Sequence, residues 1–81
     1  MKKRIHVSEV SPGMFSNKRF VLFEVEGRPY SLFVDADSLR DHTLEVQIVS
    51  LDENSAIVEL PRDTMNAGSR VRVPKADLLP G

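Results

Sequence analysis

The chain of 81 residues contains no cysteine, no tryptophan and no long apolar run. Without cysteine, disulfides and thiolate metal sites are excluded, which suits a reducing compartment. No segment approaches the ~20 consecutive apolar residues that a membrane-spanning helix needs. The basic start, MKKRIHVSEVS, is followed by no apolar stretch and so lacks the pattern of a signal peptide. We therefore expect a cytoplasmic protein without a membrane segment.

An excess of positive charge is also missing. The chain has 11 Lys and Arg against 12 Asp and Glu, a net charge of −1, whereas a dedicated binder of phosphate backbones usually shows a basic excess. With 41% apolar and 28% charged residues, the composition is that of a soluble globular protein. Its length favours a single domain over residues 1–81, with residues 1–4 expected to fray.

The strongest pattern in the chain is RFVLFEVEGRPYSLFVD, residues 19–35, which predicts two strands joined by a tight connection. A turn centred on Gly27 and Arg28 is blocked because Pro29 has no N–H to close it. We therefore expect a slightly longer loop, with Pro29 entering the second strand where no ladder donor is needed. Alternation assigns one apolar face to these residues: Val21, Phe23, Val25, Tyr30, Leu32 and Val34.

Shorter patterns on both sides of this hairpin also indicate strands. They lie around Ile5 and Val7 and over residues 44–51, 56–60 and 70–74. Alternation breaks after Ile48, which predicts a bulge near Ser50. A polar loop is expected over residues 62–69, and Asp35 or Asp37 is expected to cap a single helical turn. The pattern predicts an all-β, single-domain fold, a small five- to six-stranded antiparallel barrel of the SH3-like or OB-like type.

The last third of the chain, LEVQIVSLDENSAIVELP followed by RVRVPKADLL, resembles known small β-proteins in its strand–turn–strand–strand pattern. It is similar to RNA-binding proteins of the carbon-storage regulator type and to the SH3-like modules of translation factors. The resemblance covers about half of the chain, so it implies a small β-fold and brings RNA into consideration as a partner. Because it rests on pattern alone, no site residue is transferred.

No group of residues carries the pattern of a catalytic or metal site. A calcium loop over Asp35 and Asp37 fails because Leu39 stands where a third oxygen ligand belongs. His6 and His42 lack the spacing of zinc ligands. No serine lies in a Gly-x-Ser-x-Gly elbow, and no glycine-rich phosphate loop is present. We therefore expect a protein that is not an enzyme, with no catalytic residue, metal or cofactor.

Apolar residues on the face opposite the predicted core favour contact with another protein. Loops or the C-terminal leucines could cover them, and otherwise they form an exposed patch that in a soluble protein marks a partner or homodimer surface. The leading hypothesis is a small binding or adaptor module acting through protein–protein contact. Its predicted partner-binding residues are Phe15, Phe20, Leu22 and Phe33.

A second hypothesis is a small barrel that binds RNA or another single-stranded nucleic acid. Basic side chains around an aromatic floor hold single strands by charge and stacking. The residues predicted for that role are Lys18, Arg19, Arg70, Arg72 and Lys75. The competing interpretation is that Arg70 and Arg72 pair with glutamates of neighbouring strands, namely Glu24, Glu26 or Glu59, and the balanced net charge favours this interpretation.

Overall fold

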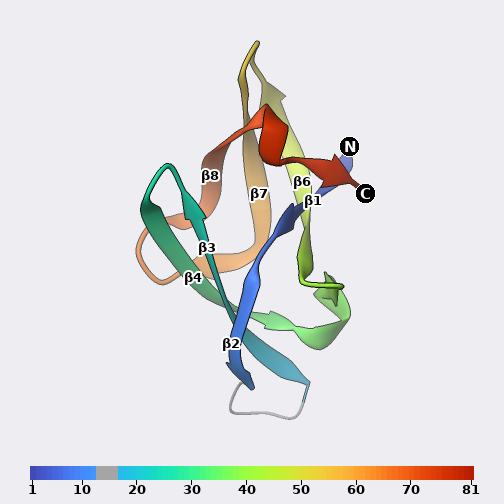
Figure 1. The fold of residues 1–81 in the computed structure, drawn as a ribbon, viewed down its shortest axis with the longest axis vertical. Coiled ribbons are helices and arrows are strands. Elements are labelled where there is room, and N and C mark those ends of the chain that lie inside the picture. The colour runs from blue at the N-terminus through green and yellow to red at the C-terminus, as the bar shows by residue number, and fades with distance from the viewer. Residues whose placement is uncertain (13–16) are drawn as a thin grey trace.

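Two antiparallel β-sheets enclose the apolar core of this protein (Figure 1). The computed structural model describes residues 1–12 and 17–81, with residues 9–12 described by their backbone alone. Within these residues the elements are β1 (Lys2–His6), β2 (Ser8–Pro12), β3 (Lys18–Val25), β4 (Arg28–Asp35), η1 (Ala36–Ser38), β5 (Leu39–Arg40), β6 (Thr43–Leu51), β7 (Ser55–Thr64), β8 (Gly68–Pro74), η2 (Lys75–Asp77) and β9 (Leu79–Pro80).

The larger sheet has the strand order β8-β7-β6-β1-β9, with β5 also paired to β6, and the smaller sheet has the order β2-β3-β4. Every pairing between these strands is antiparallel. The helical segments in the described residues, η1 and η2, are single 3-10 turns, and no described helix is long and apolar enough to cross a membrane. The predicted all-β, antiparallel class is confirmed. Over the described residues neither sheet closes on itself, so the barrel stays a prediction.

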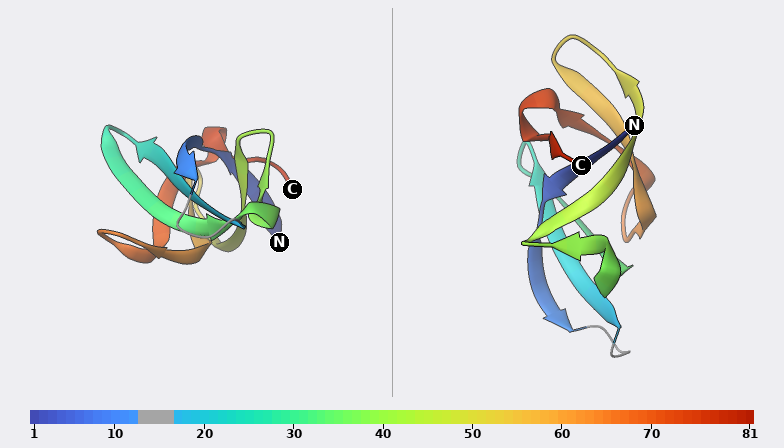
Figure 2. Two further views of the ribbon diagram at one scale, coloured as in Figure 1. Left: turned by 90° about the horizontal axis from the view of Figure 1, so that it is seen from below. Right: turned by 90° about the vertical axis from the view of Figure 1, so that its right-hand side faces the viewer.

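One nearly continuous strand belongs to both sheets. β1 and β2 are separated only by Val7, whose N–H donates to the His42 carbonyl over 2.8 Å. The blue ribbon accordingly leaves the larger sheet and enters the smaller one with a bend (Figure 1 and Figure 2). Elsewhere the Met65 N–H donates to the Ser31 carbonyl over 2.8 Å and links the β7–β8 connection to β4. The two sheets are therefore joined at more than one place around the core.

The core follows the alternation that the central hairpin predicts. Val21, Leu32 and Val34 are fully buried, and the larger sheet supplies the opposing side chains from alternate positions of its strands. Burial of these branched and aromatic side chains is the main stabilising contribution. The buried core comprises Ile5, Val7, Val21, Phe23, Val25, Tyr30, Leu32, Val34, Leu44, Val46, Ala56, Val58, Leu60, Val71 and Val73.

The connection of the central hairpin is shorter than predicted. Val25 pairs with Arg28, so Glu26 and Gly27 alone form the turn, with φ values of 51° and 82°. Positive φ at both central residues is the geometry of a type I′ turn, which matches the twist of the flanking strands. In such a hairpin the pair next to the turn is hydrogen-bonded and the following pair is not. Pro29 occupies that following position and thus enters β4 where no ladder donor is needed, as predicted.

Two other local predictions had different outcomes. The bulge near Ser50 is confirmed, because the register of β6 against β7 shifts between Ile48 and Ser50. The polar loop over residues 62–69 is wrong, since β7 runs on to Thr64 and β8 begins at Gly68. The buried Thr64 explains the tighter turn: its hydroxyl accepts the Ala67 N–H over 2.9 Å and donates to the Gly68 carbonyl over 2.7 Å.

The predicted capping of the short helical turn is correct in position and wrong in chemistry. Asp35 is the residue before η1, but its side chain makes no capping hydrogen bond. The carboxylate pairs with Lys18, which lies opposite it on β3. A cross-strand ion pair thus takes the place of the expected cap.

Residues 2–4, which were expected to fray, belong to β1 and pair with the neighbouring strands β6 and β9. Arg4 is only 8% exposed. Its Nε donates to Thr43 Oγ1 over 2.7 Å, and its Nη2 donates to the carbonyls of Thr43 and Ser38 over 2.9 and 3.1 Å. These bonds fix the start of β1 against the segment that precedes β6.

Candidate functional site

An exposed apolar cluster lies on the outer surface of the smaller sheet. Phe20 and Phe33 are opposite each other on β3 and β4, with ring centroids 4.8 Å apart and planes inclined by 50°. Leu22 follows on the same face of β3, because alternate residues of a strand share one face. Phe33 is 41% and Leu22 is 37% exposed, while Phe20 is half-buried. We call Phe20, Leu22 and Phe33 the aromatic face.

The aromatic face unites three of the four predicted partner-binding residues. The fourth, Phe15, lies outside the described residues. The C-terminal leucines do not bury the face: Leu78 packs against the core, and Leu79 lines a neighbouring groove that also reaches Leu22, which stays 37% exposed. Phe33 and Leu22 consequently remain open to a partner.

The basic residues predicted for nucleic-acid binding on β8 are engaged in ion pairs on the larger sheet. Arg70 Nε lies 2.7 Å from Glu59 Oε1, which confirms the predicted pairing with that glutamate. Arg72 Nη1 lies 2.8 Å from Asp52 Oδ2 and 3.0 Å from Ser55 Oγ. Asp52 is therefore its partner, in place of the glutamates of the central hairpin.

The remaining basic residues do not form one patch. Lys18 pairs with Asp35, and Arg19 Nη1 donates to the Lys18 carbonyl over 2.8 Å. Lys18 and Arg19 lie at the start of β3. The other end of β3, at Val25, lies near Val73 of β8. A strand from residue 18 to residue 25 spans about 23 Å. Arg72 and the exposed Lys75 flank that distant end, so the structure separates the two predicted basic groups.

Two carboxylates of these ion pairs have lowered pKa values. Hydrogen bonds from the Ser69 hydroxyl and the Arg70 guanidinium lower the pKa of Glu59. A hydrogen bond and the positive charge of Lys18 lower the pKa of Asp35. Both carboxylates are thus stabilised as anions, although the surrounding water screens these interactions. Among the described residues no three histidine or acidic side chains are grouped to hold a metal ion.

The Glu59 pair predicts a specific dependence of stability on pH. Because the pKa is lowered in the folded state, its stabilisation is present above the unfolded pKa, about 4.3, and is lost as the pH falls through the folded value. Glu59→Gln should therefore be less stable than wild type at pH 7 and should lose less stability between about pH 5 and pH 2. Urea unfolding across this interval measures the difference. Glu53→Gln, at the exposed β6–β7 turn, should keep the wild-type pH profile, and an unchanged profile in Glu59→Gln would contradict the assignment.

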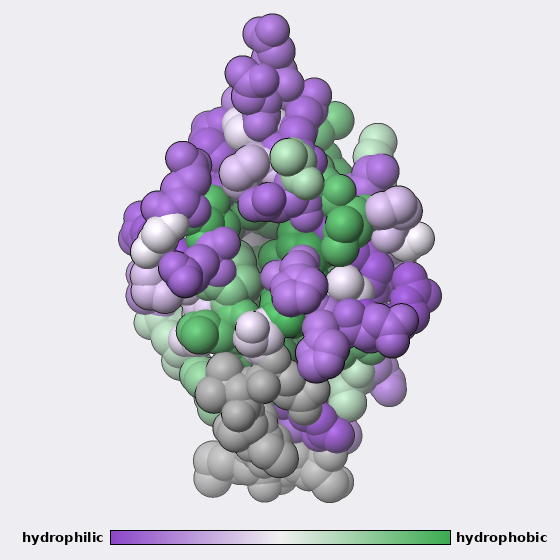
Figure 3. Space-filling view, viewed as in Figure 1, coloured by the Kyte–Doolittle hydropathy of each residue, from purple (hydrophilic) through white to green (hydrophobic). Residues whose placement is uncertain are grey.

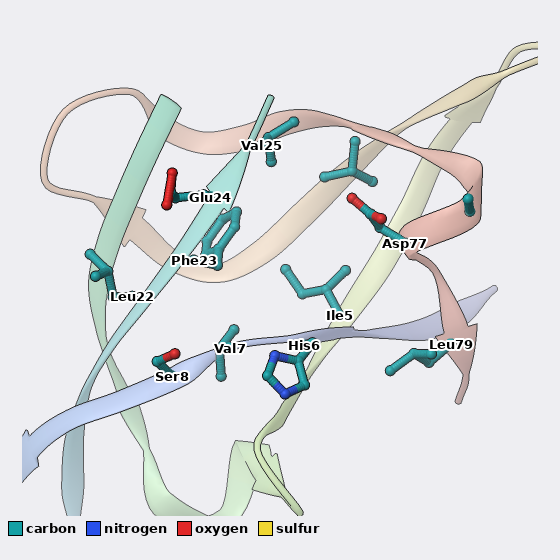
Figure 4. Close-up of a pocket in the computed structure, with 12 residues that line it drawn as sticks. Ile5, His6, Val7, Ser8, Leu22, Phe23, Glu24, Val25, Asp77 and Leu79 are labelled. Atoms are coloured by element: carbon teal, nitrogen blue, oxygen red, sulfur yellow. The ribbon is translucent and has the colours of Figure 1, made fainter. Parts of the chain in front are cut away.

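A groove of about 480 Å³ opens between the two sheets (Figure 4). Its floor is apolar. The space-filling view, in the orientation of Figure 1, shows apolar surface in the middle of the molecule with polar residues around it (Figure 3). Sequence reasoning missed the groove because its walls come from three separate segments, β1–β2, β3 and the stretch from β8 to β9. The residues that line it are Ile5, His6, Val7, Ser8, Leu22, Phe23, Glu24, Val25, Val73, Ala76, Asp77 and Leu79.

No protein-family model, curated protein or solved structure matches this chain. What the structure defines is an all-β protein with two neighbouring surface features, the aromatic face and the groove. Leu22 belongs to both of them. The functional argument therefore starts from these two surfaces.

Proposed function

We propose that this protein is a small non-enzymatic binding module that acts through protein–protein contact at its aromatic face. The observation that supports this proposal is the Phe20–Phe33 pair, 4.8 Å apart between centroids, with Phe33 41% exposed on a hydrogen-bonded sheet. Large aromatic side chains dominate the energetics of protein interfaces because they bury much area at a low cost in conformational entropy. A protein partner or a second copy would cover them.

The surroundings of the aromatic face suit this role. The Lys18–Asp35 ion pair borders it at one end of the strands, and the exposed Glu24 follows Leu22 at the other. An apolar centre with a charged rim is the usual arrangement of a protein interface. Because Phe20 and Phe33 hold each other across two paired strands, little side-chain freedom would be lost on binding.

We also propose that the two sheets form a small, partly open barrel of the SH3-like or OB-like type, and that the protein acts in the cytoplasm. Two features support the barrel arrangement. The first is the strand shared between the sheets through Val7. The second is the contact of the β7–β8 connection with β4, where the Met65 N–H donates to the Ser31 carbonyl and Asn66 Nδ2 donates to the Pro29 carbonyl over 2.8 and 3.2 Å. A partly open barrel leaves one side of the smaller sheet available for contact.

Nucleic-acid binding remains the alternative function, and the geometry gives it less support. Arg70, Arg72 and Lys18 are each paired with a carboxylate. Binding a phosphate backbone at these positions would require that those pairs be broken or shared. The aromatic face, by contrast, is exposed without any rearrangement.

The substitution Phe33→Ser tests the proposed function. We expect it to leave the fold intact, because Phe33 points away from the core, and to weaken the contact at least about thirtyfold, as loss of an interface hot spot does. Sedimentation over a range of concentrations measures self-association. Photo-crosslinking from position 22 in the native cell extract detects binding to another protein.

Leu51→Ser is the matched control, since Leu51 is 49% exposed but lies on the larger sheet. It should leave the contact unchanged. If a folded Phe33→Ser variant kept both its sedimentation behaviour and its crosslinks, the aromatic face would not be the contact surface.

A further inference from the structure

The groove lies where a hydrogen-bonded ladder stops early. β2 and β3 are paired as far as Ser8 and Leu22. In the same antiparallel register, the next hydrogen-bonded rung would join His6 to Glu24. That rung is not formed: within the described residues no backbone hydrogen bond joins these two, because β1 bends away to pair with β6. The two strands separate from this point, and the groove is the space between them.

The backbone groups of His6 point into this space. The Val7 N–H donates to the His42 carbonyl on the β6 side. Successive residues of a strand direct their N–H and C=O groups to opposite sides, so those of His6 face away from β6. β9 would lie on that side, but it pairs only with Lys3 and Arg4. The N–H and C=O of His6 are therefore left for the groove.

The backbone groups of Glu24 point into the groove from the opposite wall. The pair next to the β3–β4 turn, Val25 and Arg28, is hydrogen-bonded, and so is every second pair after it. Val25 and Phe23 thus direct their N–H and C=O groups to β4. Glu24 lies between them and directs its own groups away from β4, toward His6 on β1. A free N–H and C=O at each wall is what an added strand requires.

The side chains around the groove define the chemistry of an occupant. Its floor consists of buried Ile5, Val7, Phe23, Val25 and Val73. The exposed Asp77 side chain reaches over the groove from η2, and the exposed Glu24 lines the groove from β3 (Figure 4). Neither carboxylate has an ion-pair partner in the part of the chain that the structure describes, and the lining contains no lysine or arginine. The groove is therefore apolar below and negative at its edges.

We propose that the groove binds an extended segment of a protein partner in which aliphatic and basic residues alternate. The segment adds as a short strand between β1 and β3 and completes the rung that His6 and Glu24 leave open. Its aliphatic side chains cover the apolar floor, and its basic side chains meet Asp77 and Glu24 at the edges. This inference rests on the proposed protein-binding function and names the class of partner segment.

The blocked pentapeptide acetyl-VKVKV-amide, titrated into the full chain and followed by amide-resolved NMR, tests the proposal. The largest shifts should fall on the amides of His6 and Glu24 and should saturate at up to about 5 mM peptide, as expected for a short ligand. Asp77→Lys should weaken this binding about fivefold by replacing attraction with repulsion. Glu53→Lys changes the net charge equally at the remote β6–β7 turn and should leave the affinity unchanged.

Several results would overturn the inference. One is the absence of shifts at His6 and Glu24 over the same concentrations. Another is equal binding of the acidic peptide acetyl-VEVEV-amide, which would remove the role of the carboxylates. Concentration-dependent shifts at these amides without peptide would assign the groove to a second copy. Shifts confined to Phe20 and Phe33 would exclude the groove and leave the proposed function standing, whereas groove shifts that persist in Phe33→Ser would support the groove independently of the aromatic face.

Discussion

Replacing Leu32 by alanine is expected to lower the free energy of unfolding by about 3 kcal/mol. Leu32 has no exposed surface and lies opposite Val21 at the centre of the smaller sheet. Shortening it removes buried methyl groups and leaves a cavity between the two sheets, which hydrogen-bonded strands cannot fill by collapsing. A domain of this size is stabilised by roughly 4–12 kcal/mol in total, so the variant would lose roughly a quarter to three quarters of its stability.

Urea unfolding followed by circular dichroism measures this effect. The control is Leu51→Ala, since Leu51 is 49% exposed at the end of β6. That substitution should change the free energy of unfolding by less than about 0.5 kcal/mol. A similar loss in both variants would mean that the region around Leu32 is not the centre of the core.

Replacing Arg4 by methionine should lower the free energy of unfolding by about 2 kcal/mol. Methionine keeps the length and the apolar stem of the buried arginine but removes its donors. Thr43 Oγ1 and the carbonyls of Thr43 and Ser38 would lose their bonds to the guanidinium, which are 2.7, 2.9 and 3.1 Å long. Part-buried acceptors left without a donor retain the cost of their desolvation.

Lys2→Met is the matched control, because the Lys2 side chain is 63% exposed and its pair with Glu45 is 3.4 Å long. It should change stability by less than about 0.5 kcal/mol, as exposed ion pairs generally do. Arg4→Lys should fall between wild type and Arg4→Met, since lysine supplies charge without the planar fork of donors. A methionine variant as stable as wild type would show that burying the guanidinium costs as much as its hydrogen bonds contribute.

The parts of the fold that depend on neighbouring residues could be predicted from the sequence. Alternation in the central hairpin assigned Val21 and Leu32 to the core because a strand side chain chooses its face by its position alone. The break after Ile48 located the bulge for the same reason. The connection at Glu26 and Gly27 was predicted to be longer, because the sequence does not show that Glu26 adopts a positive φ, a conformation that residues other than glycine adopt infrequently.

The features that depend on distant segments could not be predicted. Arg4 was expected to fray as part of a short basic leader, whereas its hydrogen-bond partners, Ser38 and Thr43, come from the middle of the chain. The aromatic face was predicted because Phe20 and Phe33 lie on one hairpin. The groove was not, because it opens between His6 and Glu24 only where β1 turns away from β3 to pair with β6. No pattern within either strand records that divergence.

The strand that both sheets share also constrains how the protein reaches its native state. The hairpins β3–β4, β6–β7 and β7–β8 connect neighbouring segments and require only short loops to close. β1 pairs instead with β6, from the middle of the chain, and with β9, from its end. Contacts so distant in sequence have a large closure entropy and form slowly. β1 is thus completed only after β6 and β9 have been brought beside it, and the groove along β1 forms only at that stage.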